Sequence, residues 1–504
     1  MAADTPSVSK RRLPSWSRRH GTTLNRPRTA GTRGLILDRP TTKYHQNYCG
    51  TAVPVMDIWW MSFSSRKSVL LKTATGNMLQ LLLSPQYGDH EFEWIKVYGP
   101  VYRIKGCLGD RLMVSDPMAL QYIVNSPSFH FTRNVQAMLH WLFGEKSMIA
   151  RRGDDHKQLR AFLNPAFAAA AVRRYQPVFA RVAQRITEQL ESREAHLVDM
   201  CPLLNDAALS AISQAVFGCP VEDLGADFVE GNSQVVELTS AQSASQILFD
   251  GIGSLLPAWF LSNAVHLPIK TFSLLRTQLH LANREGWRLV REKSEAAKQG
   301  LETDGDLYSV LLNSDRSASR ALREEDIVAQ TALITIAGQD TSAKTLSFGL
   351  IELAKNPQFQ ESLRTEIHAA FGTDHENIPY DSMPLLNAFI KEILRLYPVV
   401  AYIDRVALED VVIPVSESIV TTAGKRLNQI HIRKGELVSI AIASYQRMAS
   451  RWGDDADKFR PTRWLDGTVY QGEAVGPYAN LFSFLGGPRT CLGWRFASVF
   501  ISVS

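Results

Sequence analysis

The sequence predicts a mainly α-helical fold with a minor β region. Between residues 155 and 355 most segments carry helical periodicity, and apolar residues at i, i+4 steps lie on one face of a helix. An example is the series Val178, Val182, Ile186 and Leu190. Short extended runs occur near residues 92–124 and 410–442. The composition, 45% hydrophobic and 21% charged, is that of an ordinary globular protein, so a sizeable core is expected.

A long helix is predicted over Glu325–Lys355, and its middle is unusual. The segment has no proline and ends before Asn356-Pro357. At its centre, residues 337–342 (AGQDTS) put a helix-weakening glycine and a carboxylate into an apolar surround. Several locally unfavourable residues in one place often mark a functional site. The other elements expected are strands at 101–104 and 111–114, a helix near Met383–Leu396 that stops before Pro398, and strands at 410–414, 430–432 and 437–442.

Residues 1–70 are expected to form a disordered basic segment. Residues 1–50 hold ten Lys and Arg against Asp4 and Asp38, a net charge of +8, which leaves −3 of the total +5 for the rest of the chain. This balance does not indicate a nucleic-acid-binding body. A mitochondrial transit peptide shares the composition and is the alternative. No run of 18 apolar residues predicts a transmembrane helix.

The five cysteines include no C-x-x-C pair of the kind that binds zinc, and four of them are interpreted as small buried or neutral residues. Cys491 differs, because it lies in the segment 484–493 (FLGGPRTCLG), which has the pattern F-x-x-G-x-R-x-C-x-G. A thiolate ligand of iron needs glycines that let the backbone approach a porphyrin, and N–H donors near the sulfur. The start of the helix-like segment after Gly493 would supply such donors. The alternative is a Gly-rich turn around a buried cysteine.

With this pattern around Cys491, the sequence resembles the cytochrome P450 family from about Gly76 to its end. Three further segments follow in the family's order: AGQDTS at 337–342 resembles its oxygen-activation motif, EILR at 392–395 its E-x-x-R, and FRPTRW at 459–464 its F-x-P-x-R region. The sequences of these motifs are similar to those of fungal microsomal monooxygenases. The resemblance implies the cytochrome P450 fold and haem b (iron protoporphyrin IX) with Cys491 as its metal ligand. It also implies that the haem is bound by Phe484, which would shield the sulfur, Gly487, Arg489, which would pair with a propionate, and Gly493.

The resemblance assigns residues of the AGQDTS segment to catalysis. It implies a helix that is locally opened at Gly338, with Ala337 facing the distal pocket and with Asp340 and Thr341 delivering protons to the dioxygen. Because the reduction of dioxygen consumes protons, a polar relay is chemically required. A Ser/Thr-rich helical face or a simple kink is the alternative.

Glu392 and Arg395 are three residues apart, so they lie on one side of a helix and can form an ion pair. Such pairs are common on surfaces, and E-x-x-R alone is weak evidence. Apolar neighbours indicate that this pair is at least partly buried, where a second cation would be needed. The resemblance supplies Arg463 as that cation, with a structural role.

Further propionate contacts are expected upstream and downstream of the long helix. The family commonly has W-x-x-x-R where this chain has His156 and, four residues on, Arg160. Both could donate to the haem propionates from one helical face. Arg405, seven residues after Pro398, fits another propionate-contacting position. A solvated charged helix is the alternative for His156 and Arg160.

Substrate and partners are less well defined. By resemblance, residues 399–402 would run past the haem and give a largely apolar pocket with the phenol of Tyr402, suited to hydrophobic substrates. Secondary metabolism is the expected context. No flavin or nicotinamide motif is present, so NADPH-cytochrome P450 reductase would be the partner. The resemblance implies the endoplasmic reticulum membrane, with a soluble cytoplasmic or a mitochondrial location as alternatives. The segment 255–261 (LLPAWFL) either contacts a membrane as an aromatic-rich loop or packs in the core.

Only thirteen residues follow Cys491, whereas family members continue for several dozen more. We therefore expect a cytochrome P450 domain over residues 76–504 that is truncated soon after the haem-binding loop. The leading interpretation is a haem-thiolate monooxygenase. A haem-binding but inactive truncated product is the main alternative, and a reductase-independent isomerase or peroxide-using enzyme is a third.

Overall fold

The computed structural model describes residues 75–193, 197–299, 305–314, 323–371, 380–421, 423–469 and 475–504. The predicted N-terminal segment 1–70 lies outside these residues. The mainly α-helical class with a minor β region is confirmed. In chain order the helices are α2 (Met78–Leu82), α3 (Asp89–Tyr98), α4 (Pro117–Asn125), α5 (Arg133–Phe143), α6 (Gly153–Leu163), α7 (Ala169–Glu191), α8 (Met200–Ile212), α9 (Ala226–Ser240), α10 (Ala244–Leu255), α11 (Ala258–Ala264), α12 (Lys270–Lys298), α13 (Leu307–Ser314), α14 (Glu324–Val328), α15 (Thr331–Lys355), α16 (Pro357–Phe371), α17 (Pro384–Leu396), α18 (Ile442–Tyr445), α19 (Ala449–Trp452) and α20 (Trp494–Val503).

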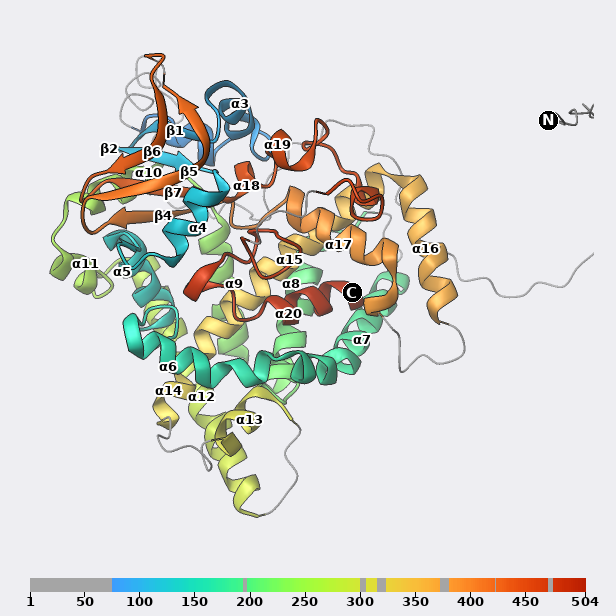
Figure 1. The fold of residues 1–504 in the computed structure, drawn as a ribbon. Coiled ribbons are helices and arrows are strands. Elements are labelled where there is room, and N and C mark those ends of the chain that lie inside the picture. Colours follow the sequence, from blue (N-terminus) through green and yellow to red (C-terminus); the bar gives the residue numbers. More distant parts are fainter. Residues whose placement is uncertain are drawn as a thin grey trace, which may run out of the picture. The chain divides into compact units, whose positions relative to one another are not determined.

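The strands form two small sheets. One has the order β1-β2-β7-β4-β3, in which β2 and β7 run parallel and the other neighbours antiparallel, and the second is the antiparallel hairpin β5-β6. Figure 1 shows the strands gathered on one side of the described part, away from α7, α8 and α20. The strands are β1 (Val101–Gly106), β2 (Gly109–Val114), β3 (Phe129–His130), β4 (Tyr402–Ala407), β5 (Val411–Val420), β6 (Arg426–Ile432) and β7 (Leu437–Ala441).

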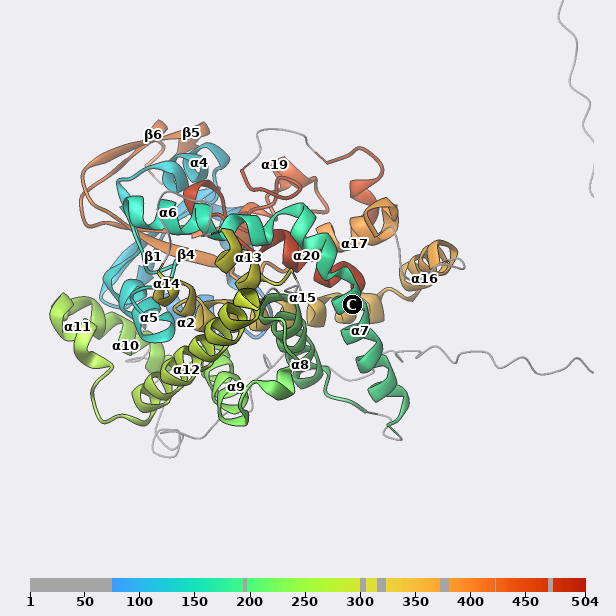
Figure 2. The same cartoon turned by 90° about the horizontal axis from the view of Figure 1, so that it is seen from below.

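Helix α15 is the central element of the helical part. It packs against α8, α9, α12, α17 and α20, and Figures 1 and 2 both show it passing among these helices. Gly338 in this helix has a packing role: a Cβ at this position would lie 2.8 Å from Cδ1 of Ile212 on α8. Gly338 therefore lets α8 approach α15 closely.

Two features of the long helix differ from the prediction. It is interrupted at Ala329 and Gln330, which separate α14 from α15. The Gln330 side chain donates to the carbonyl oxygen of Asp326 over 2.6 Å and accepts from the amide of Met148 over 2.9 Å, so it satisfies backbone groups at the break. From Thr331 onwards α15 is continuous to Lys355, so the local opening expected at Gly338 is wrong for this structure.

The large apolar cluster beside α15 is built from α7, α8, α12, α13 and α20, with Phe179 on α7 against Phe496 and Phe500 on α20. Their ring centroids lie 4.9 and 5.4 Å apart, in edge-to-face geometry. This packing fixes the helix that directly follows Cys491. Within the described ranges, no helix is both long enough and apolar enough to cross a membrane.

Candidate active site

The loop that carries Cys491 is held in shape by its backbone. Leu485 and Gly487 have positive φ angles of 57° and 66°. A Cβ on Gly487 would come within 2.6 Å of the carbonyl oxygen of Val124, so this position requires glycine. The amide of Cys491 donates to the carbonyl oxygen of Phe484 over 2.8 Å, which closes the loop.

The Cys491 side chain is exposed, yet its thiol is crowded by protein atoms. Desolvation by these atoms raises the pKa of the thiol, while a hydrogen bond from the backbone of Gly493 and the charge of Arg160 act in the opposite direction. Both opposing interactions favour the thiolate, the form that binds metals. A Cβ on Gly493 would meet no protein atom closer than Cε1 of Phe167 at 3.9 Å, so no described residue demands glycine there.

Two other cysteines provide a contrast. Cys107 is buried and Cys219 is half-buried, and both are free thiols. Burial raises the pKa of each, and an apolar surround makes a thiol inert. Neither lies in a loop that follows the pattern around Cys491.

Three arginines and a histidine that are predicted to contact a cofactor are brought together beside this loop. His156 and Arg160 come from α6, Arg405 from β4, and Arg489 from the loop itself. Arg160 donates to the carbonyl oxygen of Thr490 over 2.6 Å. His156 is only 5% exposed, so the alternative of a solvated helix face is wrong for it.

Positively charged neighbours lower the pKa of three of these groups. Burial, together with the charges of Arg489 and Arg160, lowers the pKa of His156 to about 4. Burial and the neighbouring guanidinium groups likewise lower the pKa of Arg405 and of Arg489 to about 10. Among the described residues none of the four forms an ion pair with a carboxylate within 4.0 Å. At neutral pH His156 is therefore uncharged, whereas the three guanidinium groups, buried or half-buried, are cations that need an anionic partner.

Sequence reasoning missed two members of this cluster, Arg152 and His130. Arg152 lowers the pKa of Arg489, and together with Arg489 and Arg405 it lowers the pKa of His130, for which burial is the largest cause. Phe131, next to His130, has the guanidinium of Arg405 4.2 Å and that of Arg489 5.7 Å from its ring centroid. A signal was available for Arg152, which lies just before the His156 segment, but no spacing rule marks His130.

The side chains of the catalytic residues predicted on α15 make contacts with different parts of the structure. Ala337 is exposed within a largely buried helix. The hydroxyl of Thr341 donates to the carbonyl oxygen of Ala337 over 2.8 Å. Asp340, by contrast, contacts Lys344 on its own helix and Ser240 at the end of α9. Ala337, Gly338, Asp340 and Thr341 thus occupy the middle of α15, but the Asp340 carboxylate is held at the α9 side.

The E-x-x-R pair forms a buried ionic network, as expected. Both Glu392 and Arg395 are fully buried, and two hydrogen bonds of 2.8 and 2.9 Å join them. Arg463 is the second cation, 3.1 Å from Glu392. Trp464 and the amide of Arg460 also donate to the Glu392 carboxylate, so its acceptors are satisfied.

These residues help to position the Cys491 loop through hydrogen bonds with neighbouring backbone segments. Arg395 donates to backbone carbonyl oxygens of Gln446, Ala456 and Lys458. The side chain of Gln446 in turn accepts from the amide of Phe482, which lies just before the Cys491 loop. The network therefore supports the loop without reaching the thiol.

A sequence model described as cytochrome P450 matches residues 70–503. The chain belongs to the cytochrome P450 family. Among its relatives, the cytochrome P450 monooxygenase claO of Ampulloclitocybe clavipes is 30% identical over 430 residues, which cover 80% of this chain and 77% of the relative. Cytochrome P450 monooxygenases 81 and 91 of Postia placenta are 30% and 28% identical, covering 81% and 85% of this chain and 78% and 84% of the relatives.

Members of the cytochrome P450 family carry haem, and the residues present fit this group. A thiol on an exposed residue, with a backbone hydrogen bond from Gly493 and the charge of Arg160 acting toward the thiolate, suits an iron ligand. The two propionates of haem would supply the anions that Arg160, Arg405 and Arg489 lack among the described residues, and neutral His156 would donate a ring N–H to them.

Two expectations drawn from the sequence are corrected, one about the cytochrome P450 pocket and one about the segment 255–261. The ring of Tyr402 packs with α2, β1 and β2 in a separate apolar cluster, and burial raises its pKa, because alternate residues of β4 face opposite sides of the sheet. It is therefore not a phenol in the substrate pocket. The segment 255–261 is not a loop: it contains the end of α10 and the start of α11, with Leu255 and Trp259 each 69% exposed and Leu261 buried.

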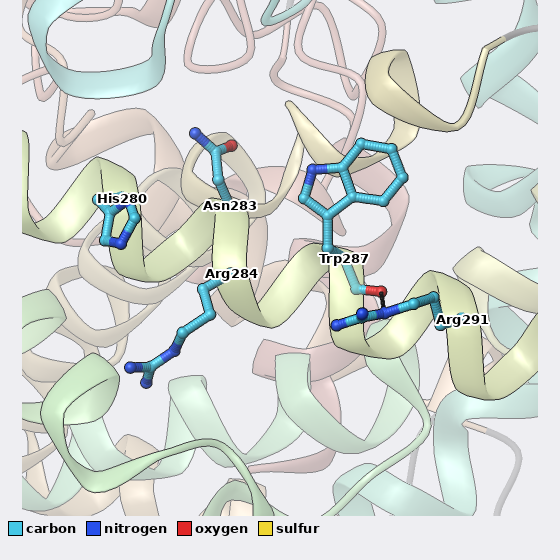
Figure 3. A pocket seen from close by; sticks show the side chains of 5 residues that line it. All are labelled: His280, Asn283, Arg284, Trp287 and Arg291. Carbon is cyan, nitrogen blue, oxygen red and sulfur yellow. Dashed lines mark hydrogen bonds between the residues drawn. The ribbon is translucent and has the colours of Figure 1, made fainter.

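A surface hollow of about 510 Å³ lies elsewhere, along α12. Figure 3 shows its lining residues on successive turns of that helix: His280, Asn283, Arg284, Trp287 and Arg291. None belongs to the Cys491 loop, the cation cluster or the AGQDTS segment. The hollow is therefore not part of the cytochrome P450 active site.

Proposed function

We propose that this protein is a haem-thiolate monooxygenase that inserts one oxygen atom of O2 into a hydrophobic organic substrate. The observation that carries the proposal is the Cys491 thiol beside His156 and three arginines that have no carboxylate partner among the described residues. Electrons from NADPH would arrive through a separate NADPH-cytochrome P450 reductase. The second oxygen atom is reduced to water, which consumes the two electrons from NADPH and two protons.

Each residue has a task in this proposal. Cys491 is the metal ligand of haem b, and the propionates are bound by His156, Arg160, Arg405 and Arg489. When bound, the haem supplies the site at which dioxygen is activated. Phe484, 9% exposed, limits water near the sulfur; Gly487 lets the loop pack against Val124, and Gly493 would let the backbone approach the ring.

Protons for the reaction would be held by Asp340 and Thr341. The Thr341 hydroxyl already donates to the carbonyl oxygen of Ala337, so its oxygen remains free to accept a proton from a second donor. Asp340, the next residue along α15, is partly accessible, with 18% of its side chain exposed. A carboxylate next to a hydroxyl can pass protons inward from solvent.

The substrate class and the location are parts of the same proposal. Val400, in the segment after Pro398, is 42% exposed and supports an apolar lining. The relatives are fungal monooxygenases, which supports a role in secondary metabolism. Large apolar side chains exposed on α10 and α11 support peripheral contact with a membrane, and we place the enzyme at the endoplasmic reticulum.

The test is the spectrum of the reduced, carbon monoxide-bound protein. Because Cys491 is the proposed thiolate ligand, Cys491→Ser should remove the thiolate-type Soret band, while Cys219→Ala should retain it. A thiolate band that persists in the Cys491→Ser protein would contradict the assignment of the ligand. No such band in the unaltered, haem-loaded chain would contradict the proposed function itself.

A further inference from the structure

Three side chains form a closed set of hydrogen bonds between α15 and the end of α9. The ammonium of Lys344 lies 2.8 Å from Asp340 and donates to the hydroxyl of Ser240 over 2.9 Å. The Ser240 hydroxyl donates to the other carboxylate oxygen of Asp340 over 3.1 Å. Each group therefore contacts both of the others, and we call this set the Ser240–Asp340–Lys344 triangle.

The triangle fixes the orientation of the carboxylate. Lys344 is four residues after Asp340, so the two lie on one face of the helix. Their side chains are 20% and 18% exposed, and a partly buried, hydrogen-bonded pair restricts rotation more than an exposed one. Without Lys344, a single hydrogen bond from Ser240 would remain.

The triangle also connects α15 to the part of the chain that precedes α10. Ser240 is the last residue of α9, and only Ala241, Gln242 and Ser243 separate it from α10. A movement of α9 and α10 would therefore alter the contacts of Asp340 directly.

We propose that Lys344 and Ser240 are positioning residues of the proton relay: they hold the Asp340 carboxylate against the end of α9, and only while this contact is intact does a water molecule efficiently carry protons from Asp340 to Thr341. The inference rests on the relay role of Asp340 and Thr341 given under Proposed function. Neither Lys344 nor Ser240 touches the reacting atoms in this scheme.

The experiment needs no identified substrate. The haem-loaded full chain with reductase consumes NADPH and O2 in one of two balanced reactions. If proton delivery fails, O2 + NADPH + H⁺ gives H2O2 + NADP⁺; if it succeeds, O2 + 2 NADPH + 2 H⁺ gives 2 H2O + 2 NADP⁺. The ratio of O2 to NADPH consumed, with the peroxide measured directly, reports how well protons are delivered. Hydrogen exchange of the backbone amides at 236–240 reports the contact with α9 without turnover.

We expect Lys344→Met to raise the ratio of peroxide to water about fivefold and to speed amide exchange at 236–240. Lys344→Arg, which keeps the charge, should behave as the unaltered chain. Ser240→Ala removes a single hydroxyl and should change both readouts in the same direction; it decides the matter if Lys344→Met does not fold. Lys355→Met is the matched control, because Lys355 is ion-paired on the same helix but with Glu352, 3.0 Å away.

Faster exchange with an unchanged ratio in Lys344→Met and Ser240→Ala would show that the triangle is only structural and would overturn the proposal. No change in either readout would overturn it as well. Asp340→Asn, measured alongside, separates the two levels: an unchanged ratio there means that the proposed relay itself is wrong. A changed ratio in Asp340→Asn with none in the other two variants leaves the relay standing and removes Lys344 and Ser240 from it.

Discussion

Asp340 and Thr341 are neighbours in the sequence, but their side chains make different contacts. Thr341 bonds back to the carbonyl oxygen of Ala337, and Asp340 turns to Ser240 and Lys344. Adjacent helical residues are about 100° apart around the axis, so only one of the two can face any single neighbour. Proton transfer between them therefore needs either a water molecule or a rotation of the carboxylate.

The hydroxyl of Thr341 can be tested separately. Thr341→Ala should retain haem and consume NADPH, but release more of the oxygen as hydrogen peroxide, because the hydroxyl that receives protons is gone. Thr335→Ala is a matched control: Thr335 lies on the same helix and also donates to the carbonyl oxygen four residues before it, over 2.9 Å. Peroxide and NADPH are measured together. Equal peroxide yields from the two variants would contradict the role of Thr341.

At the site, the sequence predicted which residues take part better than it predicted how their side chains are arranged. The pattern around Cys491, with Arg489 and the upstream His156 and Arg160, was sufficient to predict groups that the structure brings together. It could not predict Lys344 and Ser240, because their contact depends on how α9 crosses α15, and no local spacing encodes this. It also misplaced Tyr402, since which face of a strand is buried is decided by the sheet and its neighbours.

At the scale of elements, the helix and strand types were predicted better than the interruptions. Strands β1 and β2 and helix α17 agree closely with the extended and periodic runs. The break at Gln330 was not predicted, because it depends on Met148, far away in the sequence. Gly338 was interpreted as the place of an opened helix, whereas the structure gives it a packing role against Ile212.

Helix α3 is docked through a buried carboxyl group. Glu91, 3% exposed, accepts hydrogen bonds from the amide and the hydroxyl of Ser444 on α18 over 3.2 and 2.5 Å. Burial, the largest cause, raises the pKa of Glu91 to about 7, although the bonds from Ser444 oppose this. In the unfolded chain the pKa would be near the ordinary value of 4.5, so the folded state binds a proton that the unfolded state has lost.

The sign of the pH dependence follows from this difference. The contribution of Glu91 to stability is fully present below about pH 4.5 and is lost as the pH rises from there to about 7, by up to about 1.4 kcal/mol per pH unit between these two values and with no further loss above them. Glu91→Gln should remove this loss, which the urea concentration at half-unfolding, measured from about pH 4.5 to pH 8, can detect. Glu93→Gln, on the same helix and exposed, is the control. A decline of equal size in Glu91→Gln and the unaltered chain would contradict the role of the buried carboxyl.

At the scale of the whole molecule, exposed apolar side chains collect on two successive helices. Phe249, Ile252 and Leu255 of α10 are 72%, 51% and 69% exposed, and Trp259 of α11 is 69% exposed. The opposite side of this pair is held by α5: Arg133 and Trp141 donate to the carbonyl oxygens of Ser254 and Leu261. The apolar side chains are thus presented on a fixed support, which is what contact with a membrane requires.

Binding to vesicles of neutral phosphatidylcholine tests this contact. The double variant Phe249→Ser/Trp259→Ser should bind at least about tenfold more weakly, because burial of each large apolar side chain contributes about 1.5–3 kcal/mol. Val420→Ser is the control, since Val420 is 58% exposed but lies on β5. Neutral lipid is chosen so that attraction between the basic N-terminal residues and anionic headgroups does not dominate. If the double variant and the unaltered chain sediment equally with the vesicles, the exposed residues of α10 and α11 do not make the contact, and the membrane part of the proposed function is wrong while the haem chemistry at Cys491 is unaffected.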